Sequence, residues 1–188
     1  LFVLLGMVAK ADNNPIVVGN SRFTFITENL VRMEYANHQK FLDDSTLFAV
    51  NRQAGNVDVK VEKKDGKYIF STSMMSVEFE NDGFPFGQNN VRVSFEMDGK
   101  RKSWCMTDEQ RNNLGGAVTT LDAIGSPIPL QEGLLSRDGW YLINDTGKDV
   151  YKNGWLSVRD RDHVQDLYLF VYGNDYKSAL RSLKAISG

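Results

Sequence analysis

The chain has 188 residues, of which 41% are hydrophobic, so it is long enough for one domain with a real core and is not an intrinsically disordered chain. Its formal net charge is −2, and its lysines and arginines are scattered among acidic residues, which excludes the basic surface that nucleic-acid binding requires. The single cysteine, Cys105, excludes an internal disulfide, and we interpret it as a small core residue of a strand.

The first eleven residues, LFVLLGMVAKA, are almost all apolar. They are too few to cross a bilayer, which takes about 20 residues. They fit the apolar part of a signal peptide, and Ala9, Lys10 and Ala11 supply an A-x-A cleavage pattern. We therefore expect residues 1–11 to be a signal-peptide remnant and the protein to be secreted or periplasmic. A buried first strand is the alternative.

Residues 22–98 alternate between apolar and polar side chains with a period of two. This alternation predicts strands with one face on a core and one face in water. Turn-forming residues separate the strands, and Asp98 followed by Gly99 is the clearest hairpin signal. Because no helical pattern intervenes, we predict an all-β fold, an antiparallel β-sandwich over residues 12–173 with about seven to ten strands.

The last part of the chain changes its pattern. Short strands are expected at 141–143 and 155–158, and the apolar run DLYLFVY at 166–172 predicts a central strand buried on both faces. Residues 174–188 then predict one C-terminal α-helix, capped by Asn174 with Asp175 in its first turn. The stripe of this helix needs a partner, which is either the sheet or a following domain. Its members are Tyr176, Ala179, Leu180, Leu183 and Ile186.

Residues 114–140, LGGAVTTLDAIGSPIPLQEGLLSRDGW, combine glycine, proline and charge in a way that predicts a loop leaving the β domain and returning to it. The Asp138 carboxylate suits two neighbouring sugar hydroxyls, and Trp140 suits the apolar side of a sugar ring. Arg137 would keep Asp138 ionised by its opposite charge. The alternative is a surface turn flanked by Arg137 and Asp138, with Trp140 in the core.

Two other segments carry candidate side chains. Residues 159–163, RDRDH, contain possible metal ligands, but their alternating charges favour a solvated, self-neutralising turn. Residues 83–87, GFPFG, either contact a ligand or partner, or plug one end of the sandwich. The chain lacks the motifs of nucleophilic, phosphate-binding and zinc sites, and no pair of carboxylates is marked for glycoside cleavage. We therefore predict no catalytic residue, metal site or cofactor in this chain.

Residues 113–146, NLGGAVTTLDAIGSPIPLQEGLLSRDGWYLINDT, resemble a segment of the N-terminal β-sandwich of glycoside hydrolase family 31, which contains α-glucosidases and α-xylosidases. The tail LYLFVYGNDYKSALRSLKAISG and the early segment RFTFITENLVRMEYA, residues 22–36, are similar to the same family. The LSRDGW motif is the most specific part of this resemblance, which covers nearly the whole chain after residue 11.

The resemblance implies a galactose-mutarotase-like sandwich whose terminal helix leads into a catalytic (β/α) barrel. The full-length protein would then be a retaining, exo-acting α-glycosidase, and its two catalytic aspartates would lie in the barrel beyond Gly188. This chain alone would be inactive. Asp138 would hydrogen-bond the oligosaccharide substrate, Arg137 would orient it, and Trp140 would contact the sugar or anchor the loop. The implied partners are the chain's own barrel and its substrate, with no nucleic acid and no membrane span.

Two rival functions remain from the sequence. A free-standing carbohydrate-binding sandwich would carry a row of exposed aromatic side chains on one sheet face, and the sequence has no such row at a clear period of two. A structural accessory domain would carry no residue that alters substrate specificity.

Overall fold

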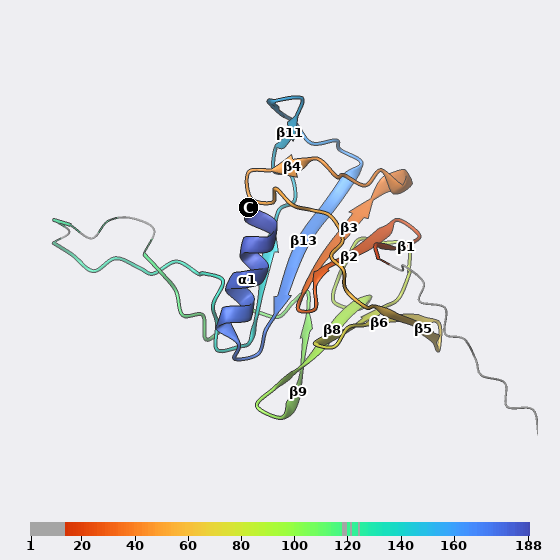
Figure 1. Cartoon of the computed structure of the whole chain (residues 1–188), viewed down its shortest axis with the longest axis horizontal. Helices are drawn as coiled ribbons and strands as arrows, with labels where there is room; N and C mark the ends of the chain where they lie inside the picture. The colour runs from red at the N-terminus through yellow and green to blue at the C-terminus, as the bar shows by residue number, and fades with distance from the viewer. Residues whose placement is uncertain (1–13, 118–119, 121, 124) are drawn as a thin grey trace, which may run out of the picture.

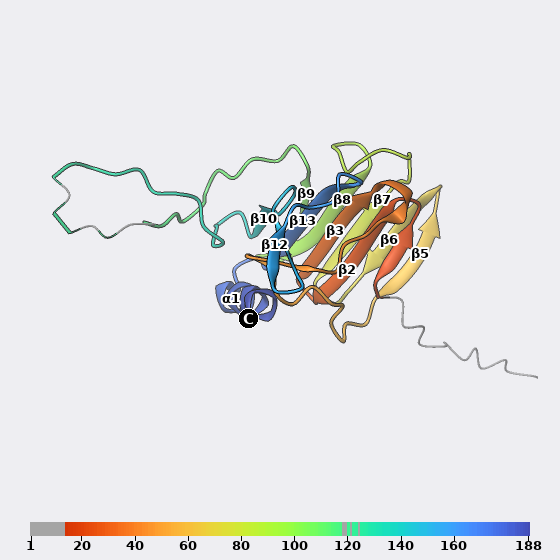
Figure 2. The same cartoon turned by 90° about the horizontal axis from the view of Figure 1, so that it is seen from above.

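The computed structural model describes residues 14–117, 120, 122–123 and 125–188, so the expected signal-peptide remnant lies outside the described residues. Antiparallel sheets pack face to face and one α-helix follows them (Figures 1 and 2), which confirms the predicted all-β sandwich with a C-terminal helix. The described residues form thirteen strands, more than the sequence pattern predicted, because several strands are only two or three residues long.

The first sheet has five strands in the order β1-β2-β3-β13-β10. Neighbouring strands pair antiparallel throughout, and β13 joins the early hairpin β2-β3 to the late strand β10. As predicted, β13 is a central strand that is buried on both faces. The strands are β1 (Ile16–Val18), β2 (Ser21–Thr27), β3 (Leu30–Ala36), β10 (Trp140–Asn144) and β13 (His163–Val171).

The second sheet also has five strands, which follow one another in chain order. The predicted hairpin at Asp98 and Gly99 is confirmed: both residues have positive φ, 54° and 67°, as a tight two-residue turn requires. The middle strands β7 and β8 bury alternate residues, as the period of two predicted. The strands are β5 (Lys60–Lys64), β6 (Lys67–Ser71), β7 (Met75–Phe79), β8 (Val91–Met97) and β9 (Lys100–Cys105).

Aromatic side chains fill the space between these two sheets. Phe23 of the first sheet packs against Phe70 and Phe79 of the second, with ring centroids 4.8 and 5.0 Å apart. Phe86 closes one end of this core, 5.4 Å from Phe23, whereas Phe84 of the same loop is exposed. Full burial of a side chain of this size contributes about 1.5–3 kcal/mol. Cys105 is buried, as predicted.

The single α-helix, α1 (Tyr176–Ser187), lies against the outer face of the first sheet (Figure 1). Asp175, and not the predicted Asn174, is its N-cap, because the Asp175 carboxylate accepts a hydrogen bond from the Ser178 amide at 3.0 Å. Ala179 and Ile186 are buried, but Leu180 is half-exposed, so the predicted stripe was one residue too wide. The helix therefore finds its partner in the sheet.

A third, small sheet in the order β12-β11-β4 stands beside the helix, near its C-terminal end (Figure 1). Val150 and Thr46 lie opposite each other on its inner side, and both are buried. Its strands are β4 (Ser45–Thr46), β11 (Val150–Lys152) and β12 (Trp155–Ser157), and a short 3₁₀ turn, η1 (Asn37–Gln39), precedes β4.

The predicted water-facing side of β2 and β3 is buried, so that part of the prediction was wrong. The polar residues on this side pair with one another. Arg22 donates to Glu34 at 2.6 Å, and Arg32 binds Asp166 of β13 at 2.8 Å. A strand that alternates polar and apolar residues looks the same whether its polar side meets water or meets opposite charges, which is why the pattern misled.

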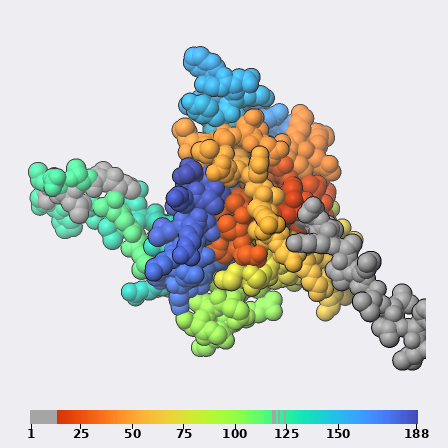
Figure 3. All heavy atoms as spheres, viewed as in Figure 1, coloured from red at the N-terminus to blue at the C-terminus, as the bar shows by residue number. Residues whose placement is uncertain are grey.

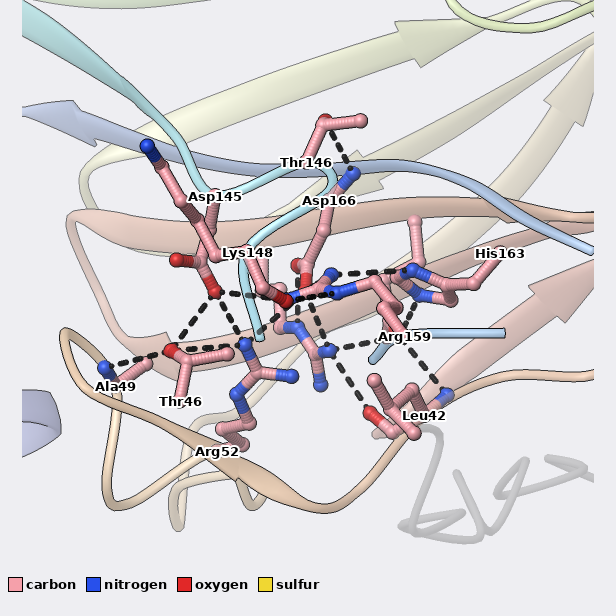
Figure 4. A network of polar contacts seen from close by, with 12 residues as sticks. Leu42, Thr46, Ala49, Arg52, Asp145, Thr146, Lys148, Arg159, His163 and Asp166 are labelled. Atoms are coloured by element: carbon pink, nitrogen blue, oxygen red, sulfur yellow. Dashed lines mark hydrogen bonds and ion pairs between the residues drawn. The ribbon is translucent and has the colours of Figure 1, made fainter. Parts of the chain in front are cut away.

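This buried ionic network continues into the segment that we predicted to be a solvated turn (Figure 4). Arg159 donates to Asp166 at 2.7 Å and to Asp145 at 3.2 Å, and Arg52 pairs with Asp145. His163 Nδ1 accepts from Arg159, since a guanidinium only donates, and this leaves Nε2 to donate to Glu34 at 3.0 Å. Arg159 and His163 are therefore buried, whereas Asp160 and Arg161 are exposed as predicted.

Across the residues that the structure describes, no helix has both the length and the apolar character needed to cross a membrane.

Candidate functional site

The segment between β9 and β10 contains a long loop, residues 109–139, whose described residues extend well away from the sandwich (Figure 2). Its two arms pair close to the base: the Leu114 amide donates to the Leu135 carbonyl, and Gly116 and Gln131 exchange backbone hydrogen bonds of 2.9 and 3.0 Å. The predicted loop that leaves the β domain and returns is thus present, and its base has the pairing of a short hairpin.

Asn113 fastens the two arms together with its side chain. Its Oδ1 accepts from the amides of Gly115 and Gly133, each at 2.9 Å, and its Nδ2 donates to the Gly133 carbonyl at 2.8 Å. Gly115 has a φ of +68°, and a Cβ added there would lie 3.0 Å from Leu130 Cβ. Glycine at this position allows the arms to approach closely.

Asp138 holds the base of the loop through a set of contacts that we call the Asp138 cluster: Asp138, Ser136, Arg111 and Asn112. Oδ2 accepts from the backbone amides of Arg111 and Asn112 at 2.9 and 3.0 Å, and from the Ser136 hydroxyl at 3.3 Å. Oδ1 accepts from Asn112 Nδ2 at 2.7 Å. Oδ1 therefore has one donor where Oδ2 has three, and it is the oxygen that can accept a further hydrogen bond.

The hydrogen bonds of the cluster also set the charge state of Asp138. Partial burial alone would raise the pKa of its carboxyl, but the hydrogen bonds from Asn112, Arg111 and Ser136 lower this pKa below its ordinary value. The largest causes that lower this pKa are thus hydrogen bonds, whereas the predicted cause was the charge of Arg137, which is exposed. Its backbone amide donates to the Asn112 carbonyl at 2.9 Å, which adds to the pairing of the arms.

Tyr172, directly after β13, connects the loop to the first sheet. Its hydroxyl donates to the Leu134 carbonyl at 2.6 Å and accepts from the Ser136 amide at 2.8 Å. Burial raises the pKa of this hydroxyl to about 12, so it stays protonated and able to donate at neutral pH. The loop base is therefore held from both sides, by Asp138 within the loop and by Tyr172 from the sheet.

Trp140, the third predicted site residue, lies in the core. Its ring is 6.1 Å from that of Trp104, and only 7% of the residue is exposed. This placement agrees with the alternative that Trp140 anchors the loop, although part of its surface still reaches a hollow beside the loop.

That hollow, with a volume of about 680 Å³, is the place where the predicted residues meet. It is bordered by the edge strand β9 and by the loop base, and Arg137, Asp138 and Trp140 all line it. Its lining combines charges of both signs with the apolar Phe95, Met97 and Trp140, a mixture that suits a polar, uncharged ligand better than a strongly charged one. The remaining charged lining residues are Lys102, Asp108, Glu109 and Arg111.

The sequence analysis missed Asn112, Asn113, Ser136 and Tyr172, which build the loop base. Two signals were available for some of them. Asn112 and Asn113 precede the Gly115-Gly116 pair with only Leu114 between, a context in which amide side chains commonly bond nearby backbone. Ser136 stands two residues before Asp138, the spacing of a local turn. Tyr172 contacts Ser136, which is 36 residues away in the sequence, so the residues around Tyr172 carry no signal of its role.

Within the described ranges, no three His, Cys, Asp or Glu side chains gather closely enough to hold a metal ion. In comparisons with known proteins, the chain matches no protein-family model and no curated protein.

Proposed function

We propose that this chain is the N-terminal, non-catalytic β-sandwich of a secreted retaining α-glycosidase of glycoside hydrolase family 31. The domain packs on a catalytic barrel and contributes its long loop to the pocket that binds terminal α-linked sugars. The resemblance of residues 113–146, with the LSRDGW motif, supports this proposal.

The observation that carries the proposal is the way in which the loop is held. Its base is fastened by the Asp138 cluster, by Asn113 and by Tyr172, while nearly all of its described tip residues are exposed. Such a loop loses little entropy on binding, because its base is ordered beforehand. A preorganised loop with a free tip is suited to entering the pocket of a neighbouring domain.

Asp138 then has two tasks. Its Oδ2 holds the backbone of the loop, and the open acceptor position of Oδ1 takes a substrate hydroxyl. Arg137 lines the hollow, where its guanidinium donates to the sugar. Trp140 packs against Trp104 and anchors the end of the loop. Hydrolysis itself belongs to carboxylates of the barrel.

The test compares two variants of the full-length enzyme on maltose-type and xylosyl substrates. Asp138→Ala is expected to lower kcat/KM by a factor that corresponds to roughly 1–3 kcal/mol of lost transition-state stabilisation. This is the scale of a lost hydrogen bond to a charged group. Asn112→Ala is the matched control, because it removes a partner of Asp138 within the cluster and leaves the carboxylate in place.

A larger loss for Asp138→Ala than for Asn112→Ala supports a substrate contact. Equal losses restrict Asp138 to holding the loop, and unchanged kinetics in both variants remove the cluster from the site. A gene product that hydrolyses no α-glycoside, or an isolated chain that binds oligosaccharides saturably, contradicts the proposal and favours the free-standing carbohydrate-binding module.

A further inference from the structure

The small third sheet and the residues next to its strands expose several apolar side chains. Trp155 is 76% exposed, Val158 87% and Leu47 76%, and Val50, Tyr151 and Leu156 are each about half-exposed. The other exposed apolar side chains of the described residues are spread over several loops and strands. Figure 3 shows the β11-β12 hairpin, in light blue, standing clear of the body of the molecule. Exposed apolar side chains that lie together mark an interaction surface, whereas single scattered ones do not.

The strand register shows that this surface is not a sugar-binding platform. Tyr151 lies opposite Leu156, so these two side chains share the outer face of the sheet. Trp155 precedes Leu156 in the same strand and points to the opposite face. The two aromatic rings therefore do not form the flat row that stacks on a saccharide, and the outer face is an apolar one suited to protein.

The sheet is also held rigidly, which an apolar docking surface needs. Thr46 of β4 donates from Oγ1 to Asp145 at 2.9 Å, and Arg159 Nε donates to the Lys148 carbonyl at 2.9 Å, just before β11. Both contacts belong to the buried ionic network (Figure 4). The network thus fixes the inner side of a sheet whose outer side has no partner among the described residues.

The end of α1 lies directly beside this surface. The amides of Val50 and Asn51 both donate to the Ile186 carbonyl, at 2.8 and 2.9 Å, and Asn51 Nδ2 donates to the Ala185 carbonyl at 3.1 Å. The last turn of the helix is therefore joined to the loop after β4, and Figure 1 places the C-terminus next to this sheet. A domain attached after the helix begins its path here.

We infer that the outer face of the third sheet, formed by Tyr151 and Leu156 and flanked by the exposed Leu47 and Val158, is the surface on which the following catalytic domain docks. This inference rests on the proposed function, which supplies that domain. The partner is an apolar surface of the same polypeptide, and docking places it on the side of the sandwich where α1 ends.

Hydroxyl-radical footprinting with mass spectrometry tests this directly. The oxidation of peptides containing residues 151–158 is compared between the 188-residue chain and the full-length gene product. We expect a severalfold lower oxidation rate in the full-length protein, while Met74, half-exposed in the turn between β6 and β7, is oxidised equally in both. In full-length protein carrying Leu156→Ser and Val158→Ser, the protection should fall, whereas Met74→Ser should leave it unchanged.

Three results overturn the inference. Equal oxidation of residues 151–158 in the two proteins, in a gene product that hydrolyses α-glycosides, refutes the docking surface and leaves the proposed function standing. A gene product without a following domain refutes both. Concentration-dependent protection in the 188-residue chain alone assigns the surface to a second copy of the chain.

Discussion

At the scale of single residues, Gly139 lies where the end of the long loop meets the start of α1. Its carbonyl accepts from the amides of Tyr172 and Gly173, both at 2.9 Å. Its φ is +80°, and an added Cβ would lie 2.8 Å from Met97 Sδ and 3.0 Å from Gly173 Cα. Glycine is required here for two separate reasons, the backbone conformation and the close approach of another chain segment.

Gly139→Ala should therefore destabilise the fold by the cost of a left-handed residue, about 1–2 kcal/mol, plus roughly 1–3 kcal/mol for the overlap. Gly147→Ala is the matched control, because Gly147 has a φ of +71° but nothing within 4 Å of its added Cβ. Urea unfolding of both variants measures the difference. Equal losses of unfolding free energy would mean that Gly173 and Met97 move aside at no cost.

At the scale of elements, the first sheet is held on its outer face by buried charge pairs in addition to apolar contacts. Asp166 of β13 meets three guanidinium groups, those of Arg32, Arg52 and Arg159. Burial alone would raise the pKa of this carboxyl, but the three arginines hold it well below its usual range. Removing one member of such a buried set typically costs about 3–5 kcal/mol, because it leaves uncompensated charge.

The lowered pKa of Asp166 makes stability depend on pH. The unfolded carboxyl takes up a proton near pH 4, at about its ordinary pKa of 3.9, whereas the folded one resists protonation to lower pH. The stabilisation is thus complete above about pH 5 and is lost as the pH falls through the folded pKa. Urea midpoints of the wild type should therefore be similar at pH 7 and pH 5 and lower at pH 3.

Asp166→Asn should be less stable at pH 7 and should show a shallower decline between pH 5 and pH 3. Asp149→Asn, at an exposed carboxylate before β11, should retain the wild-type slope. If Asp166→Asn keeps the full slope, other carboxylates carry the acid sensitivity and the role assigned to Asp166 is wrong.

The elements also show how far the sequence alone could lead. Local signals were sufficient for the hairpin at Asp98 and Gly99, for the buried strand of residues 166–172 and for the terminal helix. They could not tell that the polar side chains of β2 and β3 pair with one another and with Asp166 and His163 of β13. That pairing is a property of the tertiary fold, and the alternation of polar and apolar residues cannot predict it.

The candidate site was predictable in the same limited sense. The composition of residues 114–140 located the long loop and drew attention to Asp138, which is indeed central to the loop base. The contacts that hold the loop come from Asn112, Asn113 and Tyr172, which lie outside that segment. Contact between Asp138 and a sugar stays a prediction.

At the scale of the whole molecule, the long loop and the exposed third sheet both lie near α1, the loop toward the start of the helix and the sheet toward its end (Figure 1). A single large neighbour seated against the helix side of the sandwich would reach both. The proposed function and the docking surface therefore place the catalytic domain on the same side of the chain.

The most direct test replaces residues 117–129, the outer part of the long loop, by a glycine-serine linker in the full-length gene product. The described residues of this part make few contacts with the sandwich, so the unfolding midpoint should stay close to that of the wild type. We predict that kcat/KM on maltose-type and xylosyl substrates falls about tenfold or more, because the pocket loses one of its walls. A stable variant with wild-type kcat/KM would contradict the central claim that this domain completes the substrate pocket.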